Sequence, residues 1–158
     1  MQSVTLNNQA IIPSKVICIG RNYVDHIAEL GNEVPDQMVV FLKPNSAISQ
    51  QLIAYHQEPL HYEAELCFLY QQGRFSAVAL GLDLTKRGLQ GQLKAKGLPW
   101  ELAKAFDGAA VFSDFVAIDN IDDSLSLELM IDDNVIQSGG VSLMMYKPEI
   151  ILSQLQGF

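Results

Sequence analysis

The chain is divided into many short apolar runs by glycine, proline, asparagine and aspartate, and this division constrains the fold most strongly. Residues 16–19 (VICI) and 39–42 (VVFL) are apolar and largely β-branched, and they end at Gly20 and at Lys43-Pro44, as buried strands do. Residues 124–131 alternate polar and apolar side chains, which is the pattern of a half-buried strand. The sequence therefore predicts a fold built mainly from short strands.

Helices are expected to be few and short. The pattern predicts helices at residues 22–30, 85–96, 101–105 and 149–155. It predicts further strands at residues 62–70 and 78–82 and after Asp107-Gly108. A hairpin turn is predicted at Asp132-Asp133-Asn134, and the chain returns through residues 135–136. Most neighbouring strands can pair antiparallel, so the predicted class is α+β, mainly β. The 158 residues contain no repeat or linker, which favours one domain over residues 1–158.

The acidic composition excludes some classes of partner. The net charge is −8 and the isoelectric point about 4.7, so we expect no nucleic acid and no anionic membrane as partner. A small anionic substrate remains compatible, because a metal ion and a few cations can reverse the charge within one pocket. The chain shows no signal peptide and no apolar run near 20 residues, which predicts a cytoplasmic location. Cys18 and Cys67 lie in apolar runs and are interpreted as buried thiols, with a disulfide or a metal pair as the alternative.

The sequence HYEAELCFL offers a pair of candidate metal ligands. Side chains alternate along a strand, so Glu63 and Glu65 point to one face, where their carboxylates can converge on a single ion. A hard divalent cation such as Mg²⁺ or Mn²⁺ would offset the repulsion between them. The alternative is an exposed strand face with two solvated glutamates. The apolar residues that follow, 66–69, favour a strand that enters a core.

Other polar residues have both a functional and a structural interpretation. Asp83 ends an apolar run, where it suits either a metal ligand or the N-cap of the next helix. His26 and Glu29 share a helix face, so they form either a water-activating pair or an ordinary surface pair. His56 and His61 have no such partner and receive no catalytic role.

Lys104 lies among apolar residues in PWELAKAF and is partly shielded from water. An ammonium in such a position can stabilise an oxyanion or pair with a substrate carboxylate. The alternative is a lysine whose stem covers apolar surface while its charge reaches solvent.

Five ordered motifs together resemble the fumarylacetoacetate hydrolase family, nearest to its acylpyruvase (fumarylpyruvate hydrolase) branch. The motifs are GRNYVDHIAELGNEVP, VVFLKPNSAI, HYEAEL, LDLTKRGLQ and KGLPWELAKAFDGAA, and the match extends from about residue 16 to the end of the chain. The resemblance implies a mixed β-roll with short helices, assembled as a homodimer.

The resemblance also implies roles for individual residues. Metal binding is implied for Glu63, Glu65 and Asp83; catalysis for His26, Glu29 and Lys104; and substrate binding for Arg21, Gln90 and Lys104, whereas Lys43 is expected to be mainly structural. The implied cofactor is Mg²⁺ or Mn²⁺, and the implied substrate is a small 2-oxo acid. The main expectation is hydrolysis of a C–C bond in an acylpyruvate through a stabilised enolate. The alternative is an isomerase, tautomerase or decarboxylase of a related 2-oxo or 2-hydroxydiene diacid, for example oxaloacetate.

Three departures from the family pattern add further alternatives. The chain lacks the Thr-Gly-Thr-Pro segment and the final strands of the family, so the catalytic domain is expected to be C-terminally incomplete. The link between Leu69 and Val78 is short, and the Arg-Asp pair of the family is Arg87-Gly88 here. An inactive metal-binding remnant and a metal-free β-rich binding module are therefore also considered.

Overall fold

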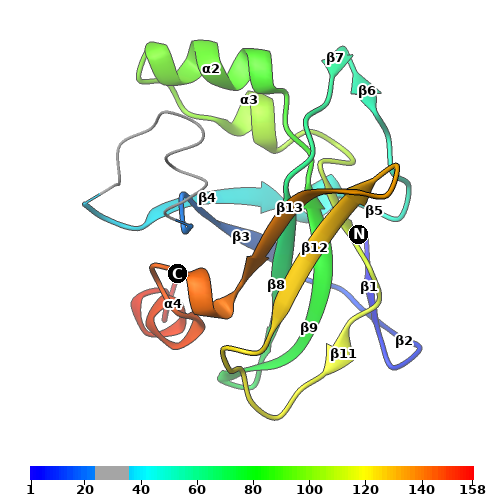
Figure 1. Cartoon of the computed structure of the whole chain (residues 1–158), viewed down its shortest axis with the longest axis vertical. Coiled ribbons are helices and arrows are strands. Elements are labelled where there is room, and N and C mark those ends of the chain that lie inside the picture. Colours follow the sequence, from blue (N-terminus) through cyan, green and yellow to red (C-terminus); the bar gives the residue numbers. More distant parts are fainter. Residues whose placement is uncertain (24–35) are drawn as a thin grey trace.

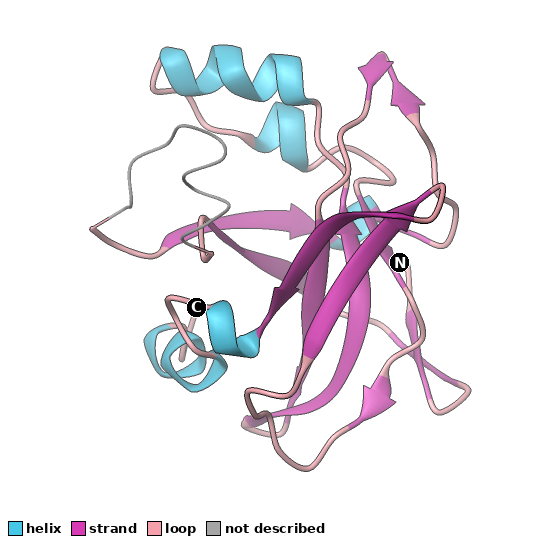
Figure 2. Cartoon of the chain, viewed as in Figure 1, coloured by secondary structure: helices cyan, strands magenta, loops and turns pink. Residues whose placement is uncertain are grey.

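The computed structural model describes residues 1–23 and 36–158, which form strands and short helices (Figure 2). The elements are β1 (Val4–Leu6), β2 (Gln9–Ile11), β3 (Lys15–Gly20), β4 (Val39–Pro44), η1 (Asn45–Ala47), β5 (Ile48–Ser49), β6 (Tyr55–His56), β7 (Glu58–Pro59), β8 (Ala64–Gln71), β9 (Arg74–Asp83), α2 (Arg87–Ala95), α3 (Glu101–Lys104), β10 (Ala110–Phe112), β11 (Val116–Ala117), β12 (Ser126–Ile131), β13 (Asn134–Gly140), η2 (Val141–Leu143) and α4 (Pro148–Gln154). The α+β, mainly β class predicted from the sequence is confirmed.

The antiparallel hairpin of β8 and β9 is the centre of the fold (Figure 1). Its tight turn places Gln72 and Gly73 at φ 50° and 83°, a left-handed backbone that matches the twist of the two strands. The other edge of β9 pairs with β10 and β11, and β5 joins β10 in parallel. The long hairpin thereby holds short segments from distant parts of the chain in one sheet.

Two-stranded pairs surround this sheet. They are β1–β2, β3–β4, β6–β7 and β12–β13, and β12 packs beside β8. The β12–β13 hairpin turns at Asp132 and Asp133, with φ 49° and 62°, as predicted from the sequence. Figure 1 shows α2 and α3 together above β4, while α4 lies below it near the C-terminus. The helices therefore lie on opposite sides of the β3–β4 pair.

Cross-strand pairs on one face of the hairpin change from acidic to apolar along its length. Leu69 lies opposite Ala77 and belongs to the buried core, which also contains Val4, Ile48, Ala79 and Phe115. Since strand residues two apart share a face, Glu65 and Leu69 project from the same side of β8. The same face therefore contributes to the core at one end and to a polar site at the other.

Most predicted elements are present, with boundaries shifted by a few residues. The prediction that the strand at 39–42 stops before Lys43-Pro44 is wrong, because β4 includes both residues. The predicted helix at 22–30 falls almost entirely outside the described residues. Strands β1, β2, β5, β6 and β7 were missed, since two or three residues are too short to show a period.

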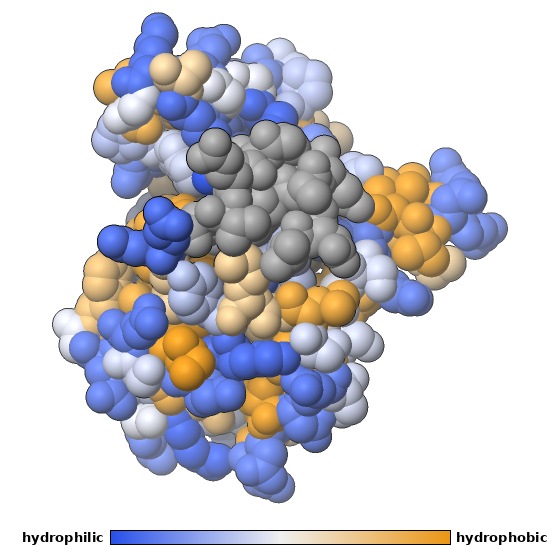
Figure 3. All heavy atoms as spheres, turned by 60° about the vertical axis from the view of Figure 1, so that its left-hand side comes forward, coloured by the Kyte–Doolittle hydropathy of each residue, from blue (hydrophilic) through white to orange (hydrophobic). Residues whose placement is uncertain are grey.

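The helices of the described residues are short, and the surface mixes apolar and polar side chains. None of the helices in residues 1–23 and 36–158 is long and apolar enough to cross a bilayer. On the face drawn in Figure 3, hydrophobic side chains form several separate patches among hydrophilic ones. Scattered apolar side chains of this kind are normal for a protein surface.

Gly81 provides a test of the close packing on the functional face of the hairpin. A Cβ at Gly81 would lie 2.5 Å from Cys67 Sγ and 3.3 Å from Phe112 Cδ1, so we expect Gly81→Ala to destabilise the fold by about 1–3 kcal/mol. Gly91 in α2 has no heavy atom within 4 Å of a Cβ, so Gly91→Ala should instead stabilise by roughly 0.5–1 kcal/mol. Urea unfolding measures both, and equal effects would contradict this packing.

Candidate active site

The register of β8 and β9 brings three carboxylates to one place. The Asp83 amide donates to the Glu63 carbonyl at 2.8 Å, so these two residues lie opposite each other at the end of the hairpin. Glu65 lies opposite Gly81, the next position on the same face. All three carboxylates line one cavity of about 730 Å³. The alternative of a fully exposed pair of glutamates is wrong, because Glu63 and Glu65 are both partly buried.

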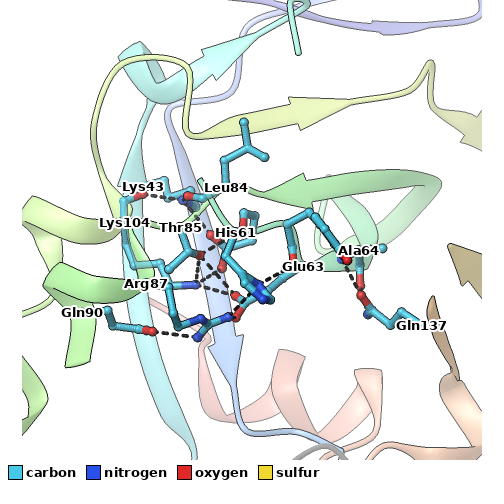
Figure 4. Close-up of polar contacts among 12 residues, drawn as sticks. Lys43, His61, Glu63, Ala64, Leu84, Thr85, Arg87, Gln90, Lys104 and Gln137 are labelled. Carbon is cyan, nitrogen blue, oxygen red and sulfur yellow. Dashed lines mark hydrogen bonds and ion pairs between the residues drawn. The ribbon is translucent and has the colours of Figure 1, made fainter. Parts of the chain in front are cut away.

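The Lys104 ammonium occupies the centre of this group (Figure 4). Its Nζ lies 2.6 Å from Glu63 Oε2, 2.6 Å from Asp83 Oδ2 and 2.7 Å from Thr85 Oγ1. Lys104 ends the short helix α3 and is 2% exposed. The alternative in which its charge reaches solvent is therefore wrong, and this amine is a buried partner of two candidate metal ligands.

Two further cations lie beside these carboxylates. Arg87 donates to Glu63 Oε1, and Lys43 Nζ lies 2.8 Å from Asp83 Oδ1. The Lys43 contact lacks hydrogen-bond alignment, so Asp83 Oδ1 has an ion pair but no hydrogen bond within the described part of the chain. Lys43 instead donates to the backbone carbonyl of Lys104, which ties β4 to α3. Its role is thus both structural, as expected, and electrostatic.

The environment shifts the pKa values of the glutamates in opposite directions. Burial by itself raises the pKa of Glu63, but Lys104 and Arg87 outweigh it and lower that pKa to about 2. Among the described residues no cation contacts Glu65, so burial together with Asp83 and Glu63 raises its pKa to about 8. Burial lowers the pKa of Lys104, but the two carboxylates beside it outweigh burial and raise the pKa above its usual value. Glu63 and Lys104 are therefore charged at neutral pH, and Glu65 retains its proton.

A side-chain amide from a different hairpin fixes the strand between the two glutamates. Gln137 of β13 accepts a hydrogen bond from the Ala64 amide at 2.9 Å and donates to the Ala64 carbonyl at 2.5 Å. These bonds replace a neighbouring strand at the edge of β8. The backbone that carries Glu63 and Glu65 is thereby held from both sides.

The cavity also contains the residues expected to bind substrate. Arg21 and Gln90 both line it, and Gln90, which is 4% exposed, accepts a hydrogen bond from Arg87 at 2.8 Å. His26 and Glu29 lie outside the described residues. Their predicted catalytic roles therefore stay predictions.

Sequence reasoning missed several polar partners of the site. Thr85 donates to the Asp83 carbonyl, and the His61 ring nitrogen Nδ1 lies 3.2 Å from Arg87. A lysine within the apolar strand VVFLKP was the available signal for Lys43, since a buried ammonium needs a partner. The N-cap alternative for Asp83 is wrong, because the N-cap residue of α2 is Lys86.

The donor groups fit a hard divalent cation. In the described ranges 1–23 and 36–158, no three His, Cys, Asp or Glu side chains are arranged closely enough to hold a metal ion, and the Lys104 ammonium lies between Glu63 and Asp83. However, Asp83 Oδ1 is buried without a hydrogen bond, and no group in those ranges donates to the Glu65 carboxylate. Carboxylate oxygens are the ligands that Mg²⁺ and Mn²⁺ prefer. The assignment of Glu63, Glu65 and Asp83 as ligands stays a prediction.

The sequence of the chain matches a known enzyme family over nearly its whole length. The model of the fumarylacetoacetate (FAA) hydrolase C-terminal region matches residues 15–158. The chain belongs to the fumarylacetoacetate hydrolase family. This confirms the resemblance carried by the five motifs.

Curated relatives in this family share one name. The mitochondrial oxaloacetate tautomerase FAHD1 of Bos taurus is 35% identical over 156 residues, which cover 87% of this chain and 70% of that protein. The oxaloacetate tautomerase YcgM of Escherichia coli is 32% identical over 163 residues, 92% of this chain and 74% of that protein. The fumarylacetoacetate hydrolase family assignment therefore points to an enzyme.

Solved structures of the family share the fold. A fumarylacetoacetate isomerase/hydrolase-type protein from Oleispira antarctica has a TM-score of 0.88 at 31% identity and covers 98% of this chain and 79% of its own. A fumarylpyruvate hydrolase from Pseudomonas aeruginosa, solved in complex with Mn²⁺ and pyruvate, has a TM-score of 0.86 at 26% identity, with 98% and 76% covered. The β-roll of the fumarylacetoacetate hydrolase type is thus confirmed.

The buried pairs of Lys104 predict a large effect on stability. Lys104→Met leaves Glu63 and Asp83 without this cation, and we expect a loss of about 3–5 kcal/mol in the free energy of unfolding at pH 7. Lys96→Met changes an exposed lysine nearby and should cost less than about 0.5 kcal/mol. Adding Glu63→Gln to Lys104→Met removes a carboxylate that has lost one of its two cations and should recover part of the stability. Urea unfolding of the four proteins tests this, and similar losses for both lysine variants would contradict it.

Glu65 predicts the pH dependence of stability in the presence of EDTA. The folded protein keeps a proton on Glu65 up to about pH 8, whereas the unfolded chain releases it near 4.5, so stability should fall as the pH rises from about 5 to 8. The slope from this group is at most about 1.4 kcal/mol per pH unit. Glu65→Gln should flatten the slope, as measured by urea unfolding at several pH values. An unchanged slope in the variant would show that Glu65 is not the titrating group.

Proposed function

We propose that the chain is a divalent-cation-dependent tautomerase of a small 2-oxo acid of the oxaloacetate class. The observation that carries the proposal is the buried cluster of Glu63, Glu65, Asp83 and Lys104 in one cavity. The name of its 32–35% identical relatives, oxaloacetate tautomerase, supports this reaction. The isomerase or tautomerase alternative from the sequence thus has more support than the main expectation of C–C hydrolysis.

The three carboxylates are the proposed ligands of the cation. Glu63, Glu65 and Asp83 would hold Mg²⁺ or Mn²⁺, and the Mn²⁺ complex of the Pseudomonas aeruginosa fumarylpyruvate hydrolase supports a divalent ion. When bound, the ion supplies positive charge that stabilises negative charge developing on substrate oxygens. It also favours the ionised form of Glu65, which burial disfavours in its absence.

The polar side chains of the cavity have distinct tasks in this proposal. Lys104 stays protonated because Asp83 and Glu63 raise its pKa, so it donates a hydrogen bond to a substrate oxygen and does not act as a base. Arg87 donates to Gln90 Oε1, which leaves the Gln90 amide nitrogen to donate to the substrate.

Keto–enol interconversion also needs a group that moves a proton between carbon and oxygen. We assign this task to His26, oriented by Glu29, both of which lie outside the described residues. The same pair would activate water if the substrate were an acylpyruvate. Tautomerisation and hydrolysis therefore differ in what His26 deprotonates, whereas the anion-stabilising groups are shared.

Hydrolysis of a C–C bond in an acylpyruvate is the second candidate. The fumarylpyruvate hydrolase neighbour favours it, and apolar side chains such as Phe68 and Leu155 line part of the cavity, where an acyl chain would fit. His26→Ala should abolish cleavage of acylpyruvates if this reaction occurs.

A single domain, a homodimer and a cytoplasmic location remain our proposals for the whole protein, although several relatives are named as mitochondrial.

The assay that tests the proposal follows the ultraviolet absorbance of the oxaloacetate enol as it converts to the ketone. We expect turnover with Mn²⁺, its loss with EDTA, and a decrease of roughly 100-fold or more in Lys104→Met. Lys96→Met should retain full activity because Lys96 is exposed and outside the cavity. Calorimetry measures Mn²⁺ binding independently.

Three results would count against the proposal. Turnover that EDTA does not change would exclude the role of the cation. Cleavage of acetylpyruvate or fumarylpyruvate without oxaloacetate tautomerisation would select the hydrolase. Retained Mn²⁺ binding with no turnover of any of these compounds would support the inactive metal-binding alternative.

A further inference from the structure

Three side chains of α2 form a stripe along the wall of the cavity. Arg87, Gln90 and Lys94 are separated by three and four residues, so they lie on one face of the helix. All three line the cavity. At a rise of about 1.5 Å per residue, the stripe extends roughly 10 Å along the helix axis from Arg87 to Lys94. Arg87 contacts Glu63 at one end, so Lys94 lies at the end remote from the carboxylate cluster.

An aromatic wall connects the cluster to Lys94. Lys104 Nζ lies 5.1 Å from the centroid of the Phe41 ring, and the Phe41 and Trp100 centroids are 5.8 Å apart. Lys94 Nζ lies 5.1 Å from the centroid of Trp100. Both rings line the cavity. Two ammonium groups therefore flank one apolar surface on which a short ligand would lie.

The two ammonium groups differ in their partners. Lys104 is paired with Glu63 and Asp83, whereas Lys94 has no carboxylate partner within residues 1–23 and 36–158 and lies over the face of Trp100. Burial lowers the pKa of Lys94, and the nearby charges of Arg21 and Arg87 lower it further. A half-buried cation next to other cations favours an anion as its partner. The protein itself does not supply that anion in the described residues.

We infer that Lys94 is a specificity-determining residue that binds the distal carboxylate of a dicarboxylic 2-oxo acid. The inference rests on the proposed function, in which the 2-oxo acid end of the substrate lies at Glu63, Asp83 and Lys104. The substrate then lies along the Phe41–Trp100 wall, and its second carboxylate reaches Lys94. Diacids such as oxaloacetate fit this arrangement better than a 2-oxo acid with an uncharged distal end, such as acetylpyruvate.

The test compares oxaloacetate with its 4-methyl ester, which keeps the 2-oxo acid and loses the distal charge. Lys94→Met should lower kcat/KM for oxaloacetate by about 10- to 100-fold, mainly through KM, and leave kcat/KM for the ester within about twofold. Lys94→Arg should restore most of the oxaloacetate value. Lys96→Met, a matched change of an exposed lysine, should affect neither compound, and equal unfolding midpoints confirm that the variants are folded.

Two results would overturn the inference. An equal loss with both compounds would mean that Lys94 only supports Trp100 and the packing of α2. An unchanged kcat/KM for oxaloacetate in Lys94→Met would mean that the distal carboxylate binds elsewhere.

A binding measurement separates failure of this inference from failure of the proposed function. If the wild-type protein converts neither compound, the proposed reaction is wrong, and calorimetry in the presence of Mn²⁺ then compares 2-oxoglutarate with 2-oxopentanoate. Tighter binding of the diacid that Lys94→Met abolishes supports the inference without any turnover. Equal affinity for the two compounds, or no binding of either, overturns it.

Discussion

The buried contact between the Lys104 ammonium and the carboxylates of Glu63 and Asp83 is the interaction on which the site depends. Three segments must meet for it to form, because Glu63 precedes β8, Asp83 ends β9 and Lys104 ends α3. Charges removed from water are stable only when they are all paired. The cluster therefore stabilises the fold only when it is complete, and it fixes α3 against the end of the hairpin.

The same hairpin face joins this cluster to the core. Leu69 and Ala77 are buried at one end, and Glu63 and Asp83 line the cavity at the other. A rigid sheet holds the carboxylates in place at little further entropic cost, as a precise site requires. Glu65 differs from its neighbours because no cation in the described part of the chain contacts it, and its raised pKa makes it the group that a divalent ion would change most.

The helices α2 and α3 determine what kind of anion the cavity accepts. Lys104 provides a positive charge at the carboxylate cluster, and Lys94 provides another beyond the Phe41–Trp100 wall. Tautomerisation, decarboxylation and hydrolysis of 2-oxo acids all develop negative charge on the same oxygens, so the cluster suits each of them. The distal cation separates diacids from other substrates, which is a question of binding and not of chemistry.

The sequence by itself determined the larger strands, the fold class, the family and several of the polar residues around the cavity. The period of two in HYEAEL was enough to place Glu63 and Glu65 on one face, and the ordered motifs identified Asp83, Gln90 and Lys104. These features depend on residues that lie close together in the sequence, so a strand period or a short motif is enough to show them. Strands of two or three residues such as β6 were beyond this reasoning, because they form only where another segment supplies the hydrogen bonds.

Only the tertiary structure decided which charges are paired and which are not. No local pattern shows that Lys43 approaches Asp83, that Gln137 closes the edge of β8 at Ala64, that Lys104 is fully buried, or that Lys94 has no carboxylate partner among the described residues. The contacts of Lys104 with Asp83 and of Gln137 with Ala64 join residues 21 and 73 positions apart, and the energy of such contacts depends on burial as much as on residue type. The spacing of residues along the chain determines the faces of strands and helices, whereas the packing of those elements determines the electrostatics of the site.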